Sequence, residues 1–300
     1  MTKTAVVVGA TNGIGKAISC RLAHEGFNVI AVGRDKPGRS EEVIDHLIKC
    51  SNNNSEAQHE FRACNAFELK QVKECAEKIV KDHSDLDALV MTQGMATIQS
   101  FTPTSEGNDE KLTLHFWSRA AFATCLLPSL RKSSMPGGSV VLSVLSGGVH
   151  SPYKKYNVDP ELKTNYSITN AANAAGYYND LFFDKCAKIN EEVNFIHAAP
   201  GFVASKWGTE MPTLLRGMIR CMQTFGKSPD KCAGFMVRPI LQCSNGEIEL
   251  EVPNGGKKGL YIMNEDATSG KLSKGHTEEA IACVWNTTED VLRRAGVTIE

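Results

Sequence analysis

Short runs of aliphatic and β-branched residues alternate with longer segments of helical periodicity along the first two thirds of the chain. The predicted strands cover residues 5–8, 29–32, 86–91, 140–145 and 193–198. The predicted helices cover residues 14–24, 69–81, 112–130 and 171–188. Apolar strands that alternate with helices predict a parallel sheet covered on both faces. Because crossovers between parallel strands are right-handed, the fold class is α/β with a doubly wound sheet.

The last third of the chain is less regular than the rest. Residues 260–263 predict one extra strand, and residues 278–294 predict a closing helix. The sequence contains neither an internal repeat nor a proline-rich linker. We therefore expect residues 1–300 to form a single domain, with an irregular lid or insertion around residues 204–256.

Composition and charge exclude several classes of protein. Apolar residues make up 42% of the chain and charged residues 22%, which is ordinary for a globular protein and argues against disorder. The longest nearly apolar stretch, residues 120–127, is far shorter than the roughly 20 residues that a transmembrane helix needs. The formal net charge of −1 gives no reason to expect a nucleic acid or an anionic membrane as partner.

The N-terminus and the cysteines bear on location and redox state. No basic segment leads into an apolar targeting core, so we expect a cytoplasmic protein. The ten cysteines lack any Cys-x-x-Cys spacing, which argues against a zinc site, and we expect no metal. In a reducing compartment, these cysteines are expected to be free thiols.

A glycine-rich turn, 9–15, follows the first predicted strand directly and opens the first predicted helix. Glycines here permit a tight turn and let a dinucleotide pyrophosphate approach the backbone, while the helix N-terminus presents free N–H groups to the phosphates. The candidate cofactor contacts in this turn are Gly9, Thr11, Asn12, Gly13, Ile14 and Gly15. The alternative is a structural turn without a ligand.

The Gly-x-x-x-Gly-x-Gly spacing of this turn resembles the short-chain dehydrogenase/reductase superfamily, and further landmarks follow in the order of that family. Residues 89–94 occupy the place of its Asn-Asn-Ala-Gly segment, and residues 200–205 are similar to its Pro-Gly-x-Val-x-Thr motif. The resemblance covers residues 5–210, and its degraded landmarks resemble an atypical, retinol-dehydrogenase-like branch that recurs among fungal sequences. It implies a Rossmann fold and further cofactor contacts at Gly94, Pro200, Gly201, Val203 and Ser205.

The residue after the second strand favours one dinucleotide over the other. An acidic side chain there accepts hydrogen bonds from the adenine ribose, whereas arginine pairs with a 2′-phosphate. This chain has Arg34 at that position, and Asp35 comes one residue later. We therefore predict NADP(H) as the cofactor, unless Arg34 is only a solvated strand end. The resemblance also places Asn65 where the family has an aspartate beside the adenine.

The family's catalytic motif, Tyr-x-x-x-Lys, is absent. The best match starts at Tyr166, and Asn170 takes the place of the lysine. The lysine's role is to stabilise the phenolate, because tyrosine has an intrinsic pKa near ~10. The stretch from Asn170 to Pro200 is longer than the family usually has, which leaves the alignment of Tyr166 open.

Two further residues complete the catalytic set that the resemblance implies. Ser146 falls at the position of the serine that polarises the substrate oxygen, with Ser143 as the fallback. His115 occupies the place of a supporting asparagine. It can relay protons, or it can be a packed helix histidine.

Three functions stay open. The first is an NADP(H)-dependent oxidoreductase that transfers hydride between nicotinamide and a carbonyl or alcohol of a small molecule. A stripe of Leu215, Met218, Ile219 and Met222 in the expected lid suits a hydrophobic substrate, although ordinary helix packing or a weak membrane contact explains it as well. The second is a catalytically impaired dinucleotide-binding protein that acts as a sensor or assembly component. The third is different chemistry on the same fold. Each of these functions is compatible with a homo-oligomer.

Overall fold

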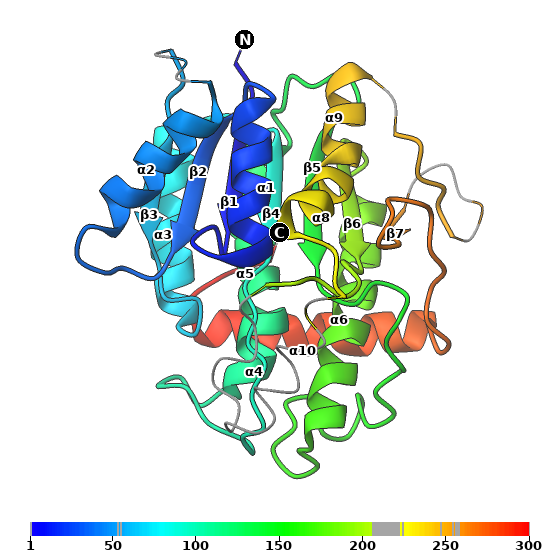
Figure 1. Ribbon diagram of the computed structural model, residues 1–300. Coiled ribbons are helices and arrows are strands. Elements are labelled where there is room, and N and C mark those ends of the chain that lie inside the picture. Colours follow the sequence, from blue (N-terminus) through cyan, green and yellow to red (C-terminus); the bar gives the residue numbers. More distant parts are fainter. Residues whose placement is uncertain are drawn as a thin grey trace.

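The computed structural model describes residues 2–52, 54, 56–205, 223, 225–246, 248–253, 255 and 259–299. Seven parallel strands form one sheet in the order β3-β2-β1-β4-β5-β6-β7 (Figure 1). The strands are β1 (Thr4–Val8), β2 (Asn28–Gly33), β3 (Glu60–Ala63), β4 (Ala88–Met91), β5 (Ser139–Val144), β6 (Val193–Ala198) and β7 (Tyr261–Met263). This confirms the predicted doubly wound α/β fold, including the extra strand after residue 260.

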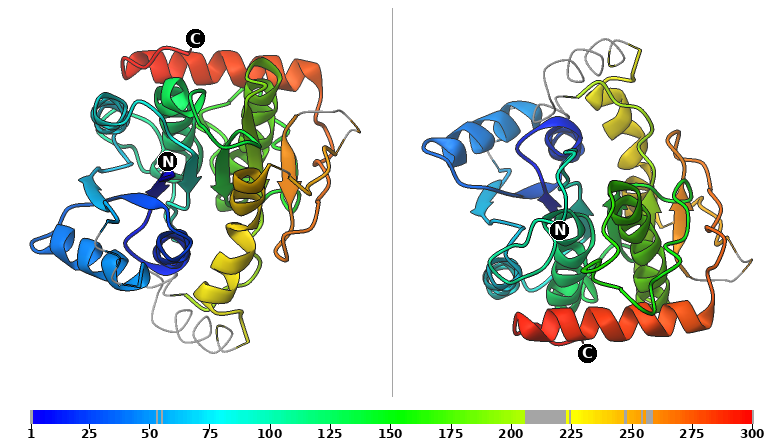
Figure 2. Two further views of the ribbon diagram at one scale, coloured as in Figure 1. Left: turned by 90° about the horizontal axis from the view of Figure 1, so that it is seen from above. Right: turned by 90° about the horizontal axis from the view of Figure 1, so that it is seen from below.

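Helices cover both faces of the sheet (Figure 2). One face carries α1 (Gly13–His24), α2 (Arg39–Cys50), α8 (Pro229–Met236) and α9 (Arg238–Asn245). The other face carries α3 (Leu69–Asp82), α5 (Ser118–Leu130) and α6 (Ile168–Ile189), and α10 (Glu278–Arg294) crosses over α5 and α6 as an outer layer. Each helical layer buries its own apolar core against the sheet.

The strand order reverses between β1 and β4: the chain continues from β1 to β2 on one side and from β4 to β5 on the other side. In a doubly wound sheet, ligands bind at such a point, beyond the carboxyl ends of the strands. The hydroxyl of Thr92, just after β4, donates to the carbonyl oxygen of Val8 at 2.9 Å and joins the two strand ends. The fold therefore places the glycine turn at the expected ligand crevice.

The helix predicted over residues 112–130 is built from three consecutive elements. These are α4 (Glu110–Leu112), the π-helical turn η1 (Thr113–Trp117) and α5. The carbonyl of His115 accepts a hydrogen bond from the Asn179 amide of α6, at 2.9 Å, instead of being held only within its own helix. A cross-helix contact of this kind is not visible in hydrophobic periodicity, which reads α and π turns alike.

The expected irregular segment, 204–256, is partly helical, because α8 and α9 lie within it. The side chain of Ser228 caps α8 by accepting from the N–H of Lys231, and Pro229 occupies the first turn. This Ser-Pro start is a recognised helix signal that the prediction overlooked. The predicted hydrophobic stripe from Leu215 to Met222 lies outside the described residues.

The expectation of free thiols is wrong for two of the ten cysteines. A disulfide joins Cys20 of α1 to Cys50, the last residue of α2. Both helices lie on the same face of the sheet, so residues 30 positions apart become neighbours only after folding. Among the described helices, none is long and apolar enough to cross a membrane.

Candidate active site

The glycine turn is fixed by two close backbone approaches. Gly9 has φ +84°, and a Cβ there would lie 2.8 Å from the amide nitrogen of Gln93. A Cβ on Gly15 would lie 2.3 Å from the carbonyl oxygen of Gly9. Contacts this short exclude any side chain, so Gly9 and Gly15 hold α1 against the ends of β1 and β4.

Gly13 differs from the other two glycines because a Cβ at its position would meet no atom closer than ordinary van der Waals contact. Its φ is +54°, and the nearest atom to that Cβ would be the Cβ of Ser205, at 3.5 Å. The N-cap residue of α1, Asn12, places no side-chain hydrogen bond on the helix, and the first turn contains no acid. Helix N–H groups with no side-chain cap suit an anion. The residues present therefore fit a dinucleotide pyrophosphate at the N-terminus of α1.

The remaining turn residues pack against the sheet and the core. The methyl group of Thr11 approaches Gly33 at the end of β2, where a Cβ would lie 2.6 Å from it. Ile14 packs against the core that α1 shares with α8. Thr11 and Ile14 therefore position the turn through their contacts with the sheet and with the core. The structure brings together Thr11, Asn12, Gly13, Ile14 and Ser205.

The adenine side of the site lies at the ends of β2 and β3. Arg34 directly follows β2 and is exposed. The amide of Cys64 donates to the carbonyl of Gly33 at 2.8 Å, which places Asn65 at the same edge of the sheet as Arg34. The Asn65 side chain accepts from the amide of Phe67, at 3.4 Å. Among the described residues, Arg34 has no ion-pair partner, so its guanidinium is available to an anion.

The nicotinamide side lies beyond β5 and β6. Gly201 has φ +67°, and a Cβ there would lie 1.5 Å from a carboxylate oxygen of Glu265, which leaves no room for a side chain. Lys227 pairs with that carboxylate at 3.0 Å. Val203 is buried, and Pro200 connects β6 to this segment. The predicted 200–205 segment is therefore held in place beside the strand ends.

A valine in place of Gly13 is expected to weaken dinucleotide binding tenfold or more while the fold survives. The branched side chain would stand at the N-terminus of α1, where the pyrophosphate must approach the backbone. Gly26→Val is the matched control: Gly26 also has a positive φ, +85°, but nothing lies within 4 Å of its Cβ position. Calorimetric titration of both variants checks this, and normal binding by Gly13→Val would show that the loop is only a turn.

The predicted catalytic tyrosine lies away from the predicted serine. Tyr166 precedes α6, and its hydroxyl donates to the carbonyl oxygen of Gln99 at 3.4 Å. Burial, with the Asp109 carboxylate as a smaller cause, raises the pKa of Tyr166 to about 12. Gly176, which faces Ser146, stands eight residues into α6, or roughly 12 Å along the helix axis. The structure does not bring Tyr166 and Ser146 together.

Asn170 lies in the first turn of α6. Its side-chain amide donates to the carbonyl oxygen of Asn165 at 2.7 Å, and its backbone amide donates to the hydroxyl of the N-cap residue Ser167. These contacts stabilise the start of the helix. Asn170 supplies no positive charge to Tyr166, as the sequence already indicated.

His115 lies on η1 and contacts the loop that follows β4. Its Nε2 accepts a hydrogen bond from the amide of Met95 at 3.0 Å, so the proton of the neutral ring is on Nδ1. Burial, reinforced by the charges of Arg119 and Lys111, lowers the pKa of His115 to about 3. Gly94 lets the ring approach, because a Cβ there would lie 3.0 Å from Nε2. A neutral ring with an occupied Nε2 fits the packed-histidine alternative better than a proton relay.

The two serines at the end of β5 differ in their hydrogen bonding. Ser143 accepts from the guanidinium of Arg119 at 2.7 Å and donates to Asn179 at 2.8 Å. The hydroxyl of Ser146 is buried and has no hydrogen-bond partner. Ser143 therefore uses its hydroxyl within the core, whereas no hydrogen bond in the described structure occupies the hydroxyl of Ser146.

Sequence reasoning missed four charged or titratable residues around these serines. Arg119 is buried and donates to the backbone oxygens of Val144 at 3.1 Å and Gln93 at 2.7 Å, which ties β4 to β5. The other three residues, His150, Asp180 and His197, form a cluster beside Ser146. For Arg119 and Asp180, a charge on the apolar face of the predicted helices 112–130 and 171–188 was the available signal.

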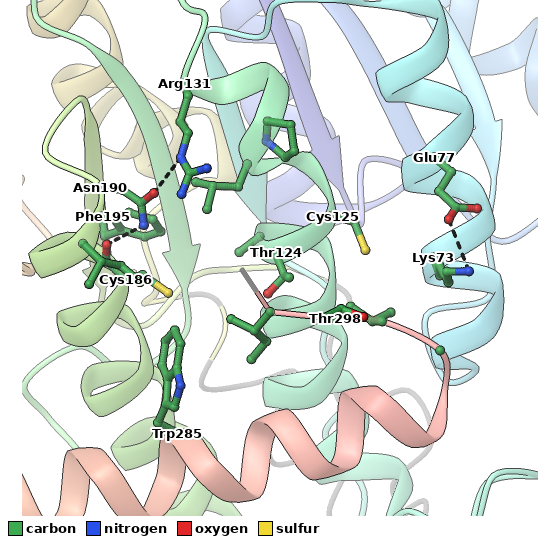
Figure 3. A pocket seen from close by; sticks show the side chains of 17 residues that line it. Lys73, Glu77, Thr124, Cys125, Arg131, Cys186, Asn190, Phe195, Trp285 and Thr298 are labelled. Atoms are coloured by element: carbon green, nitrogen blue, oxygen red, sulfur yellow. Dashed lines mark hydrogen bonds and ion pairs between the residues drawn. The ribbon is translucent and has the colours of Figure 1, made fainter.

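A separate cavity of about 270 Å³ lies between α3, α5, α6, the end of α10 and the tail that follows it (Figure 3). Arg131 pairs there with Asn190, at 2.8 Å, and Lys73 pairs with Glu77, at 3.2 Å. None of the predicted site residues lines it.

The parallel sheet, the glycine turn and the serine beyond β5 together define a dinucleotide-binding protein of the doubly wound class. The family model for short chain dehydrogenases matches residues 3–155. An oxidoreductase of Emericella nidulans is 30% identical over 288 residues, covering 92% of this chain and 80% of its relative. The chain belongs to the short-chain dehydrogenase/reductase family.

Other similarities are more distant. Human retinol dehydrogenase 13 is 28% identical over 144 residues, 48% of this chain and 42% of that protein. The structure of an NADPH-bound carbonyl reductase from chicken fatty liver superposes with a TM-score of 0.60 at 16% identity, covering 90% of this chain and 99% of that one. At this identity the superposition shows the fold.

Proposed function

We propose that the protein is an NADP(H)-dependent oxidoreductase of the retinol-dehydrogenase-like branch, which transfers hydride between nicotinamide and a carbonyl or alcohol of a hydrophobic small molecule. The observation that carries this proposal is the N-terminus of α1, which has no side-chain cap and no acid in its first turn and begins at a glycine that, unlike Gly9 and Gly15, has no close contacts. Family membership and the name of the human retinol dehydrogenase support the reaction class and a hydrophobic substrate.

When bound, the nicotinamide supplies the hydride donor or acceptor. The chain's own residues would bind and orient the dinucleotide: the first turn of α1 would hold the pyrophosphate, Arg34 would pair with the 2′-phosphate, and the 200–205 segment would border the nicotinamide. Ser146 donates a hydrogen bond to the substrate oxygen and stabilises the charge that develops on it. The alternative that Tyr166 donates the proton to that oxygen is tested by a phenylalanine variant; where Tyr166 is not the donor, the proton comes from solvent water.

The preference for the phosphorylated cofactor is tested at Arg34. We expect NADPH to bind about tenfold more tightly than NADH, because a guanidinium pairs with the 2′-phosphate in a charge-assisted contact. Arg34→Ala should remove most of that difference in calorimetric titrations. Lys36→Ala is the matched control, since Lys36 is an exposed cation in the same loop. Equal affinities of the parent protein for both cofactors would refute the role of Arg34.

A second function is favoured by two specific observations. The hydroxyl of Tyr166 is bonded to a backbone carbonyl, and Asn170 stands in place of the lysine. Both fit a dinucleotide-binding protein with impaired catalysis, acting as a sensor or assembly component. Oxidation of NADPH measured against a broad carbonyl panel separates the two functions: tight NADPH binding without any turnover would favour the second.

A further inference from the structure

A closed ring of contacts surrounds the backbone of Ser146. The amide of Ser146 donates to Nε2 of His197 at 3.2 Å, and its carbonyl oxygen lies 2.9 Å from Nδ1 of His150. Both imidazoles face the carboxylate of Asp180: Nδ1 of His197 at 2.5 Å and Nε2 of His150 at 3.2 Å. We call His150, Asp180 and His197 the Ser146 clamp. Its three side chains are at most 3% exposed.

The atoms that face the two rings decide where the protons are. His197 accepts the amide proton of Ser146 at Nε2, so it is neutral and carries its proton at Nδ1, toward Asp180. His150 faces an acceptor on both sides, a carbonyl oxygen at Nδ1 and a carboxylate oxygen at Nε2. Only a ring protonated at both nitrogens is attracted to both acceptors. The arrangement therefore favours an imidazolium at His150 and a carboxylate at Asp180, which form an ion pair at 3.2 Å rather than a well-aligned hydrogen bond.

The charges that surround the clamp agree with this assignment. Asp180 raises the pKa of His150 against the effect of burial, whereas burial lowers the pKa of His197. The guanidinium of Arg119, on α5, further disfavours a charge on His197. The remaining titratable neighbour is Tyr177 of α6, whose ring stands 6.5 Å from that of His150 and whose hydroxyl donates to the carbonyl of Gly275.

The positively charged group of the Ser146 clamp, the ring of His150, lies close to the Ser146 hydroxyl. A Cβ on Gly176 would lie 2.5 Å both from Cγ of His150 and from Oγ of Ser146, so those two atoms are no more than twice that distance apart. Asp180 lies on the far side of the His150 ring, at Nε2. In a site shielded from water, a cation this close favours negative charge on an oxygen that Ser146 contacts.

We propose that His150 is a cationic positioning residue for Ser146, and that its buried imidazolium supplies positive charge beside the Ser146 hydroxyl. This inference rests on the proposed oxidoreductase function. His150 keeps its proton throughout: it fixes the backbone of Ser146 and stabilises charge on the substrate oxygen through the Ser146 hydroxyl. A metal ion at the same three residues fits less well, because His197 Nδ1 as a ligand would require a proton on Nε2, which faces the Ser146 amide.

The protonation state is tested without reference to activity. In long-range ¹H–¹⁵N spectra of the full-length protein labelled at histidine, one ring should carry protons on both nitrogens at pH 7.5, above the ordinary histidine pKa of about 6.5. That signal should be absent from His150→Gln and present in His276→Gln. His276 is the matched control, since it pairs with Asp184 at 3.1 Å, outside the clamp. The Ser146 amide resonance should titrate with the same pKa in the parent protein, which assigns the signal even if His150→Gln fails to fold.

Several results would overturn the proposal. They are the absence of a persistent imidazolium at pH 7.5, its survival in His150→Gln, or stoichiometric zinc that Asp180→Asn removes. If the parent reduces a carbonyl substrate, His150→Gln should lower kcat about 10²-fold with little change in KM for NADPH, and kcat of the parent should fall as His150 loses its proton. A parent that shows the imidazolium but no turnover refutes the oxidoreductase function and leaves the charge assignment standing.

Discussion

Replacing Asp180 with asparagine is expected to lower the free energy of unfolding by about 3–5 kcal/mol near pH 6, the usual cost of breaking a buried ion pair by removing one partner. Asp180 is the only carboxylate that faces both imidazoles of the Ser146 clamp in the described part of the chain. An amide of similar shape keeps the packing but leaves His150 without a counter-charge in a buried position.

The sign of the pH dependence follows from the direction of each pKa. The pKa of His150 is raised in the folded protein, so its contribution is present below the unfolded value of about 6.5 and is lost as pH rises through the folded value. The pKa of Asp180 is lowered to about 2, chiefly by His197 and His150 acting against burial, so its contribution is lost only as pH falls from about 4 toward 2. The difference between the parent and Asp180→Asn should therefore be larger at pH 6 than at pH 9.

Urea unfolding at both pH values measures this difference. Asp184→Asn is the matched control, because Asp184 also pairs with a histidine and a lysine but lies nearer the surface. We expect it to cost less than Asp180→Asn, because Lys188 is 44% exposed and water screens part of that ion pair. Equal losses for the two variants, or a difference that does not depend on pH, would contradict a charged pair at His150 and Asp180.

Most of the fold could be predicted because all strands but β3 are short, nearly continuous apolar runs; the hydrophobic pattern did not predict β3, with the sequence EFRA. β1, β2, β4, β5 and β6 were visible in this way, since a parallel sheet covered on both faces needs no polar alternation. Two short helices were missed within 204–256, where sequence patterns are brief. The disulfide was missed because the proximity of Cys20 and Cys50 depends on the packing of α1 against α2.

The site divides into a half that sequence could locate and a half that it could not. The dinucleotide half depends on glycines whose spacing is set by a local turn, and the structure brings Gly13 and Ser205 together as expected. The catalytic half depends on which turn of α6 faces Ser146. The order of the sequence motifs predicted that Tyr166 faces Ser146. In the structure the residue of α6 that faces Ser146 is Gly176, which lies more than two helical turns further along. Residue spacing in the sequence could not reveal the Ser146 clamp either, because its three residues come from a loop, from α6 and from β6.

Ser146→Ala is expected to lower the rate of carbonyl reduction by about 10²–10⁴-fold, whereas Tyr166→Phe should stay within a few fold of the parent. The reason is geometric: the Ser146 hydroxyl has no partner beside the strand ends, while the Tyr166 hydroxyl is held by Gln99. Steady-state kinetics with NADPH and a reducible carbonyl measure both rates, and calorimetry of each variant confirms that NADPH still binds.

The pH dependence of the reaction rate distinguishes Tyr166 from Ser146 as the catalytic residue without any mutation. If Tyr166 were the proton donor, oxidation of an alcohol should accelerate on the alkaline side, because its phenol, with a pKa of about 12, ionises only at high pH. If the imidazolium of His150 supports Ser146, activity should instead fall as pH rises through the raised pKa of His150. A rate that climbs steadily with pH and disappears in Tyr166→Phe would restore the tyrosine as the catalytic residue. In that case α6 would have to bring Tyr166 next to Ser146 once the dinucleotide is bound, and Gln99 would lose its hydrogen bond to the phenol.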